Sequence, residues 1–329
     1  MAQQTLNIRG FVAGIDIEPD EYLLPLQEVI VNSIQSIEDK TEPEQGTISI
    51  KVIRGKQINI DGIDEPYLPI SGFEVYDNGV GFVSQRFNAF NNAFTDLNKN
   101  KGCKGVGRYT VIACFGSMEV NSTYYENNEW SNRVFRFDSI NGVNPEGKKN
   151  IKTASEQKLC TVVRLNNYKK NFQDYINKNR ISLEDIAEGI IQHCLLYFIT
   201  NEVPLIRIYN ENEPDKSCIV NDIYSSIVKF DNEVKSLKIV KIKSLFNINY
   251  LRNYKNKIHA LHLCANKREV GKKISLSNHI PSFVKELTDE KQNKYYLSIY
   301  ITGDFLDEKA NNQRNKFAIP LNSASDFFQ

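Results

Sequence analysis

The sequence of 329 residues lacks several features that define common protein classes. Its six cysteines include no Cys-x-x-Cys pair and lie mostly in apolar runs, a pattern typical of reduced, buried thiols and not of a disulfide framework or a zinc site. No stretch approaches the ~18 apolar residues that a membrane helix needs. The opening residues, MAQQTLNIRG, lack the basic and apolar pattern of a signal peptide. We therefore expect a cytoplasmic protein with no membrane segment.

Net charge is also nearly absent, at +1, so the overall composition indicates no partner. The charge is unevenly distributed, however. Between Lys229 and Lys273 there are ten Lys and two Arg against three acidic residues, a local net charge of +9. These basic residues are interleaved with strand-forming apolar residues, which makes duplex DNA a possible partner, although a solvated basic surface would have the same composition.

A hydrophobic content of 41% can form one large core or two ordinary ones, and the length favours two domains. The polar segment 211–217 is the predicted linker, so we expect a first domain over 1–212 and a second over 218–329. Local patterns predict the elements listed here: strands over 6–12, 47–53, 57–63, 160–165 and 203–211, a hairpin turning near Asn127, and helices over 19–39, 182–200 and 281–292.

The helix expected over 19–39 has two distinct faces. Glu28, Asn32 and Gln35 fall within one narrow sector of it. The opposite sector is an apolar stripe that would face the core, made of Leu23, Leu26, Ile30, Ile34 and Ile37. A carboxylate and an amide therefore point together away from the core, although such a pair also occurs on ordinary solvated helices.

A second motif is the stretch FEVYDNGVGF, from Phe73 to Phe82. A short apolar strand runs into a turn that contains two glycines, which places the carboxylate of Asp77 at the end of the strand. Taken alone, Asp-Asn-Gly is most often a simple hairpin turn.

A third motif is KGCKGVGRYTVIACFG, from Lys101 to Gly116, where a glycine-rich loop opens a predicted helix. Backbone amides at such a helix start can bind phosphate. The glycines fit neither the Walker order nor the dinucleotide fingerprint. The polar loop before them suits a mobile lid, or else a solvated connection. A fourth motif is the strand CTVVRL, which carries the hydroxyl of Thr161.

These four motifs, in this order, resemble those of the GHKL ATPases, the superfamily of the gyrase B subunit, the ninety-kilodalton heat-shock chaperone, sensor histidine kinases and MutL. The resemblance implies an α+β fold, with a Bergerat-type two-layer α/β sandwich as the ATPase domain. It also implies that the chain binds ATP with Mg²⁺ and hydrolyses ATP slowly to ADP and phosphate.

The resemblance implies a role for each matching residue. Glu28 would be the general base and Asn32 the magnesium ligand, while Asp77 would accept a hydrogen bond from the adenine amine and so reject guanine. Thr161 would support this aspartate, although Cys160 stands where the family commonly has glycine, and Gln35 stands where many members have Asp. The full set of implied nucleotide contacts in this domain is Asn32, Asp77, Gly79, Gly81, Gly102, Lys104, Gly105, Val106, Gly107, Arg108 and Thr161.

The second domain resembles, more loosely, the transducer-type domain (ribosomal S5 domain 2-like) of gyrase, MutL and microrchidia-type proteins. The similarity lies in two central strands, the helix expected over 281–292 and the motif ANKREV. Transducer domains send a basic residue to the γ-phosphate. Lys267 or Arg268, and Arg314 or Lys316, could do so here, and the spacing does not choose among them or exclude ordinary surface cations.

The leading hypothesis for function is an ATP-gated homodimer that acts as a DNA-associated clamp or as the regulatory ATPase of a prokaryotic defence or restriction system. The ending SASDFFQ is compatible with a longer polypeptide that carries an effector. The alternative is a chaperone-like clamp for protein clients, whose binding would depend less on salt than phosphate contacts do. A histidine kinase is disfavoured because only about 25 residues precede the helix of Glu28, with no phosphoacceptor segment.

Overall fold

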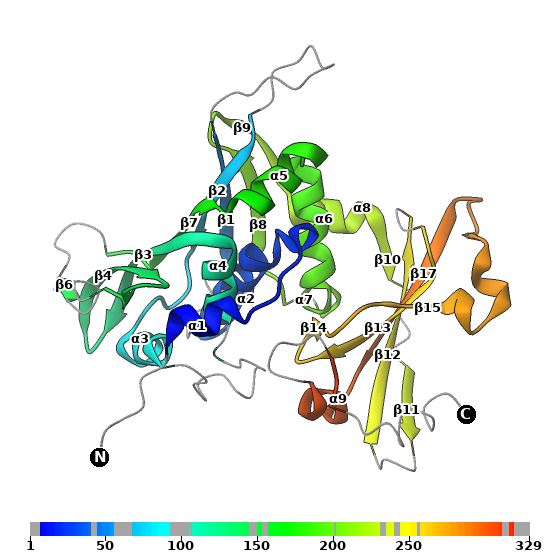
Figure 1. The fold of residues 1–329 in the computed structure, drawn as a ribbon. Coiled ribbons are helices and arrows are strands. Elements are labelled where there is room, and N and C mark those ends of the chain that lie inside the picture. Colours follow the sequence, from blue (N-terminus) through cyan, green and yellow to red (C-terminus); the bar gives the residue numbers. More distant parts are fainter. Residues whose placement is uncertain are drawn as a thin grey trace. The chain divides into compact units, whose positions relative to one another are not determined.

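The computed structural model divides the chain into two compact units (Figure 1). Unit 1 comprises Met1–Gln192 and Val203–Asn221, and unit 2 comprises His193–Glu202 and Asp222–Gln329. The residues that the structure describes are 7–40, 45–55, 68–92, 105, 107–144, 150–152, 157–200, 202–230, 235–239, 244–254, 257–310 and 316–318.

Within these residues, unit 1 is built on a nine-stranded sheet of order β5-β4-β3-β7-β2-β1-β8-β9, with β6 paired to β4. Only β1 and β8 pair in parallel, and the other pairings are antiparallel. The strands are β1 Thr47–Arg54, β2 Ile70–Asp77, β3 Phe115–Glu126, β4 Glu129–Asp138, β5 Gly142–Val143, β6 Asn150–Lys152, β7 Cys160–Tyr168, β8 Leu205–Asn210 and β9 Glu213–Ile219.

The helical elements that accompany this sheet are α1 Ile8–Ala13, η1 Pro19–Glu21, α2 Leu24–Glu38, α3 Ser84–Asn91, α4 Gly107–Cys114, α5 Lys170–Asn179 and α6 Leu183–His193. Helix α2 lies beside α4 and packs against β2 (Figure 1). Its apolar stripe is fully buried at Leu26, Ile30 and Ile34, as the sequence predicts. Alternate residues of the strands, such as Ile50 and Val75, complete this core, because side chains alternate between the two faces of a sheet.

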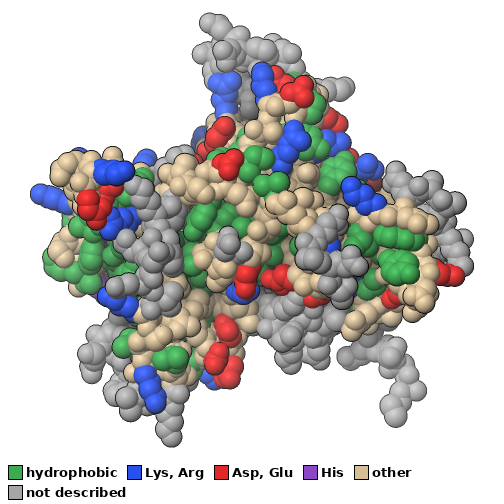
Figure 2. Space-filling view, turned by 180° about the vertical axis from the view of Figure 1, so that it is seen from behind, with side chains coloured by type: hydrophobic (Ala, Val, Ile, Leu, Met, Phe, Trp, Pro, Cys, Tyr) green, Lys and Arg blue, Asp and Glu red, His purple; other side chains and the backbone are tan. Residues whose placement is uncertain are grey.

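The other face of the sheet is polar and carries a row of charges across five neighbouring strands. Arg136 on β4 lies opposite Glu119 on β3, Glu119 opposite Arg164 on β7, Arg164 opposite Glu74 on β2, and Glu74 opposite Lys51 on β1. The Glu74 carboxylate is 2.6 Å from both Lys51 Nζ and Arg164 Nε. Opposite charges on adjacent strands stabilise a sheet face that meets solvent. Figure 2 shows one face of the molecule, on which hydrophobic, basic and acidic side chains are interspersed.

Unit 2 contains an eight-stranded sheet of order β10-β12-β17-β13-β14, counted over the described residues, with β11 on β12, β15 on β13 and β16 on β17. Its elements are α7 Leu195–Ile199, the greater part of α8 Val220–Ile227, β10 Val228–Phe230, β11 Lys235–Ile239, β12 Ser244–Asn253, β13 Ala260–Ala265, β14 Arg268–Glu269, β15 Ile274–Ser275, η4 Leu276–Asn278, η5 Pro281–Val284, β16 Leu287–Thr288, β17 Lys294–Thr302 and α9 Asp304–Lys309.

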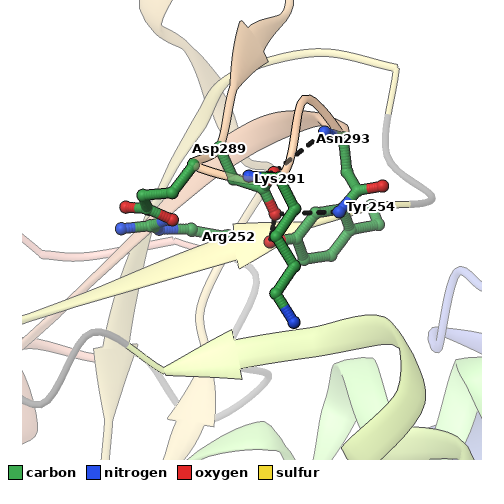
Figure 3. Close-up of polar contacts among 6 residues, drawn as sticks. Arg252, Tyr254, Asp289, Lys291 and Asn293 are labelled. Carbon is green, nitrogen blue, oxygen red and sulfur yellow. Dashed lines mark hydrogen bonds and ion pairs between the residues drawn. The ribbon is translucent and has the colours of Figure 1, made fainter.

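The turn between β16 and β17 is organised by one buried carboxylate (Figure 3). Asp289 Oδ1 accepts hydrogen bonds from the backbone N–H of Lys291 at 2.9 Å and of Asn293 at 2.8 Å. Its other oxygen accepts from the Tyr254 hydroxyl at 3.0 Å and the Asn293 amide at 3.1 Å. Desolvation acts to raise the pKa of Asp289, but these donors outweigh it and hold the pKa well below its usual range.

The sequence correctly predicts an α+β fold and most of the first sheet, but three local predictions are wrong. Residues 8–13 form α1 and not a strand, because the Asn7 side chain accepts from Gly10 N at 3.0 Å and caps the helix. The linker predicted at 211–217 is a turn followed by most of β9, which pairs with β8. The helix predicted over 281–292 is η5, β16 and a turn. The helical prediction over 182–200 is confirmed, as two helices, α6 and α7, that are separated at Cys194.

Other local predictions are confirmed by the fold. The β3–β4 hairpin turns at Asn127 and Asn128, which both have positive φ. The Ser182 hydroxyl accepts from Asp185 N at 3.1 Å at the start of α6. The strand predicted over 57–63 lies outside the described residues. No helix in the described part of the chain is long and apolar enough to cross a membrane.

Candidate nucleotide site

Asp77 is the last residue of β2 and is only 6% exposed. Its side chain points toward α2, where the Ser33 hydroxyl donates to Oδ2 at 2.8 Å. On the other side, the backbone N–H of Gly79 donates to Oδ1 at 3.0 Å. A buried carboxylate requires such donors, because an unpaired buried charge is costly. The turn after β2 and the helix therefore hold the carboxylate between them.

Burial is the largest influence on this carboxyl group and raises the pKa of Asp77 from 3.8 to about 6. The hydrogen bonds from Ser33 and Gly79, and the positive charge of Arg86, act in the opposite direction. Arg86 lies on α3, where its guanidinium contacts Asp39 and donates to the backbone oxygen of Gln35 at 3.1 Å. Near neutral pH the Asp77 carboxylate is thus mostly ionised, with a protonated form accessible in mild acid.

Thr161 lies on β7 directly opposite Asp77, in the register of the antiparallel β2–β7 pair. Its hydroxyl forms a hydrogen bond of 2.9 Å with the hydroxyl of Ser122 on β3. Ser122 in turn accepts from the backbone N–H of Phe82 at 2.9 Å. Asp77, Thr161 and Ser122 therefore form one polar patch across three adjacent strands, with the turn after β2 attached to it.

The packing of the chain itself requires glycine at two positions of that turn, Gly79 and Gly81. A Cβ added to Gly79 would lie 2.4 Å from the Ser36 hydroxyl oxygen of α2. Gly81 has φ of +73°, and a Cβ there would lie 2.6 Å from Ser122 Oγ. Close packing against α2 and β3, together with a left-handed backbone at Gly81, requires both residues to lack a side chain. That they also leave room for a base stays a prediction.

Glu28 lies one turn before Asn32 on α2, and its carboxylate meets the start of α4. A Cβ added to Gly107, the first residue of α4, would lie 2.3 Å from Glu28 Oε2. The carboxylate therefore rests against the backbone at the N-terminal end of this helix, where the helix dipole favours negative charge. The same property would favour a phosphate group there. Asn32 is exposed on the adjacent turn of α2.

Arg108 follows Gly107 but does not extend into solvent. It is 9% exposed, and its guanidinium lies 5.2 Å from the ring centre of Phe90 and 4.6 Å from that of Tyr109. Its Nη2 donates to the Tyr109 hydroxyl at 3.1 Å. Burial lowers the pKa of Arg108. The structure thus gives this cation an aromatic environment, and its contact with phosphate stays a prediction.

The remaining predicted residues are placed less completely. Gly105 has a left-handed φ of +68°. Gly102, Lys104, Val106 and Arg314 lie outside the described residues. In unit 2, Lys267 forms an ion pair with Glu202 and lies 5.1 Å from the ring centre of Tyr197. Arg268 is buried and Lys316 is exposed, so the predicted γ-phosphate contact from this unit stays a prediction.

Sequence reasoning did not single out three hydroxyl residues that the structure brings to Asp77 and its turn. Ser33 bonds the carboxylate itself, while Ser36 accepts from Gly81 N at 3.3 Å and Ser122 from Phe82 N. Ser33 could have been found, because it follows Asn32 on the helix that carries the acid–amide pair. Ser122 could not, since its strand carries no motif and its role depends on the pairing of β3 with β7.

Comparisons with known proteins bear on the fold. No family model and no curated protein matches this sequence. Among solved structures, the N-terminal domain of a DNA repair protein is similar with a TM-score of 0.50 at 12% identity, covering 98% of this chain and 97% of that chain. The ATPase region of Saccharomyces cerevisiae topoisomerase II gives 0.47 at 11% identity, covering 95% and 84%. The same region bound to ICRF-187 gives 0.47 at 12% identity, with the same coverage. At these identities the first likeness shows the fold alone, and the other two lend it no further weight.

Proposed function

We propose that this chain is a magnesium-dependent ATPase of the GHKL type, in which bound ATP drives association of two copies. The observation that carries the proposal is the position of α2. This one helix contacts the Asp77 carboxylate through Ser33, the turn of Gly79 and Gly81 through Ser36, and the start of α4 through Glu28. The motif on α2, the turn after Asp77 and the start of α4 therefore lie together, although they are separated by up to about eighty residues in the sequence.

The chemistry of these groups suits a nucleotide. Asp77 is mostly ionised at neutral pH and can accept a hydrogen bond from an exocyclic amine, which adenine offers and the corresponding position of guanine does not. Glu28, beside a helix start that would bind phosphate, could orient and deprotonate a water molecule for in-line attack. The exposed amide oxygen of Asn32 is a hard, neutral donor that fits Mg²⁺. Bound Mg²⁺ would neutralise the charge of the phosphate oxygens.

DNA is the partner that we propose to test first. The similar solved structure is a domain of a DNA repair protein. In unit 2, the described part of the basic tract has five exposed lysines, Lys235, Lys238, Lys257, Lys272 and Lys273. Lysine clusters on a surface favour phosphate contacts, whose affinity falls steeply with salt. The same ATPase could regulate an effector, as in a prokaryotic defence or restriction system.

The first experiment measures ATP turnover and ATP affinity for the wild type and for Glu28→Ala. The matched control is Glu38→Ala, which removes an exposed acid from the other end of α2. We expect Glu28→Ala to retain ATP and to lose about 100-fold or more in turnover, the usual contribution of a general base. The control should behave as the wild type. Unchanged turnover in Glu28→Ala would remove this residue from the proposed role.

A second experiment tests association. Sedimentation with and without a non-hydrolysable ATP analogue is expected to show a doubling of mass when the analogue is present. Repeating it with duplex DNA at low and high salt identifies the partner class. Association that ignores the analogue would contradict ATP gating, and complexes that resist high salt would favour the chaperone-like alternative over DNA.

A further inference from the structure

Ser33 is a buried hydroxyl that the roles described above leave unused. It is 3% exposed and lies on the side of α2 that faces β2. Its hydroxyl donates to Asp77 Oδ2 at 2.8 Å, and the backbone N–H of Gly79 donates to Oδ1 at 3.0 Å. Each oxygen of Asp77 thus has one fixed donor. A carboxylate oxygen has two acceptor sites, so each oxygen can accept one more hydrogen bond.

The surroundings of Asp77 make this hydroxyl important. The strands on either side of β2 place Ile48 and Thr161 opposite Asp77, and neither carries a charge. The charged group that acts on it is Arg86 from α3, which ranks after Ser33 and Gly79 in its effect. Burial works against the ionised form and raises the pKa of Asp77 to about 6. Removing the hydroxyl of Ser33, one of the two donors that the described residues supply to Asp77, would leave the effect of burial on its pKa less opposed.

We propose that Ser33 is a positioning residue. Through its hydrogen bond it keeps the Asp77 carboxylate ionised and turned for the base of ATP, and so it sets the pH range and the base selectivity of the nucleotide site. This inference rests on the proposed function. It concerns a residue that touches Asp77 and not the nucleotide, so its effect must appear as a change in the behaviour of Asp77.

The protonation state decides which base is accepted. The ionised carboxylate only accepts hydrogen bonds, which suits the adenine amine. The protonated form presents an O–H donor, which would face the donor of adenine but could bond the oxygen that guanine carries at the same position. Without the Ser33 hydroxyl, the Asp77 carboxyl group would stay protonated up to a higher pH. ATP would then bind more weakly near neutral pH, and discrimination against GTP would decrease.

The test compares the wild type with two variants. Ser33→Ala removes the hydroxyl, and Ser33→Thr keeps one at the same position. Ser71→Ala is the control, because Ser71 lies on the same strand as Asp77 and its hydroxyl donates to a backbone oxygen, that of Ile53, at 3.2 Å. Affinities for ATP and GTP with Mg²⁺ are measured by calorimetry between about pH 5.5 and about pH 8.5. In parallel, the titration of Asp77 without nucleotide is followed by NMR of carboxyl-labelled aspartate, with Asp77→Asn identifying the signal.

We expect the Asp77 midpoint to rise by about one pH unit or more in Ser33→Ala, a tenfold change in the proton equilibrium. ATP affinity at pH 7 should fall several-fold, the ratio of GTP to ATP affinity should rise, and Ser33→Thr should restore both. An unchanged midpoint in Ser33→Ala, or equal losses at every pH, would overturn the inference even if ATP still binds. If the wild type does not bind ATP but the midpoint rises in Ser33→Ala, the proposed function fails while the role of Ser33 toward Asp77 stands. Should Ser33→Ala not fold, Ser33→Cys, which keeps a weaker donor, must show an intermediate rise in the midpoint.

Discussion

Replacing Asp77 by asparagine is expected to separate stability from nucleotide binding. In the folded chain the pKa of Asp77 is about 6, against 3.8 for an ordinary aspartate, because the carboxylate is buried. The folded chain therefore binds a proton more tightly than the unfolded chain, and wild-type stability falls as the pH rises from about 4 through about 6. Asparagine does not titrate, so the variant escapes this loss.

The size of the effect follows from the shift. A difference of about two pKa units corresponds to about 3 kcal/mol of unfolding free energy. The asparagine amide can donate to the Ser33 hydroxyl oxygen, and its carbonyl can accept from Gly79 N, so both present contacts have a neutral replacement. The free energy of unfolding of Asp77→Asn relative to the wild type should thus rise by about 3 kcal/mol between about pH 4 and about pH 7.5.

Urea unfolding at several pH values measures this difference. Trp130 on β4 is the single tryptophan of the chain, so its fluorescence reports on unit 1 alone. Calorimetry with ATP on the same samples should show that binding is lost. A difference in stability that stays constant with pH, or that falls as the pH rises, would refute the reasoning about the buried carboxylate.

Three further substitutions follow from the contacts described. Glu74→Gln should lower the urea midpoint of unit 1, because it removes the carboxylate that Lys51 and Arg164 share. The expected cost is about 1 kcal/mol, since both cations also meet solvent, and a gain in stability would contradict the ion-pair role. Gly107→Ala should displace the carboxylate of Glu28, which an added Cβ would meet at 2.3 Å, so ATP turnover should fall while far-ultraviolet circular dichroism stays the same; normal turnover would count against this contact. Asp289→Ala should destabilise unit 2, as measured by hydrogen exchange, and the difference in stability from the wild type should decrease in strong acid. The pKa of Asp289 is held low, so the stabilisation by its carboxylate is lost only as the pH falls through that low value. A difference in stability that is equal at all pH values would exclude the carboxylate as the cause.

The parts of the site that the sequence predicts are those with a local signal. The apolar stripe of α2 has the period of a helix, so the opposite face with Glu28 and Asn32 could be recognised without coordinates. The prediction that Gln35 belongs to this outer face is wrong, because Gln35 is only 1% exposed. Asp77 stands where an apolar strand meets two glycines, and it is indeed the last residue of β2. Thr161 lies on a strand that the sequence predicts, in register opposite Asp77, and its support of this aspartate stays a prediction.

The parts that the sequence does not predict depend on contacts between distant segments. β9 has the polar composition of a linker because it is an edge strand that is mostly exposed, and only its pairing with β8 shows it to be a strand. Arg108 follows a glycine-rich loop, as a phosphate-binding residue would. Its guanidinium instead lies over the ring of Phe90, which comes from another helix and could not be assigned to it from the sequence. The segment 281–292 has helical spacing, yet Asp289 fixes a turn within it through Tyr254 of a neighbouring region.

The most direct test of the account is calorimetric titration of the wild type and of Asp77→Asn with ATP and GTP in the presence of Mg²⁺ at pH 7.5. We predict saturable binding of ATP by the wild type, much weaker binding of GTP, and no measurable binding of ATP by the variant. Equal affinity of the wild type and Asp77→Asn for ATP, or no binding of ATP by the wild type, would contradict the proposal that Asp77 and α2 form an adenine nucleotide site.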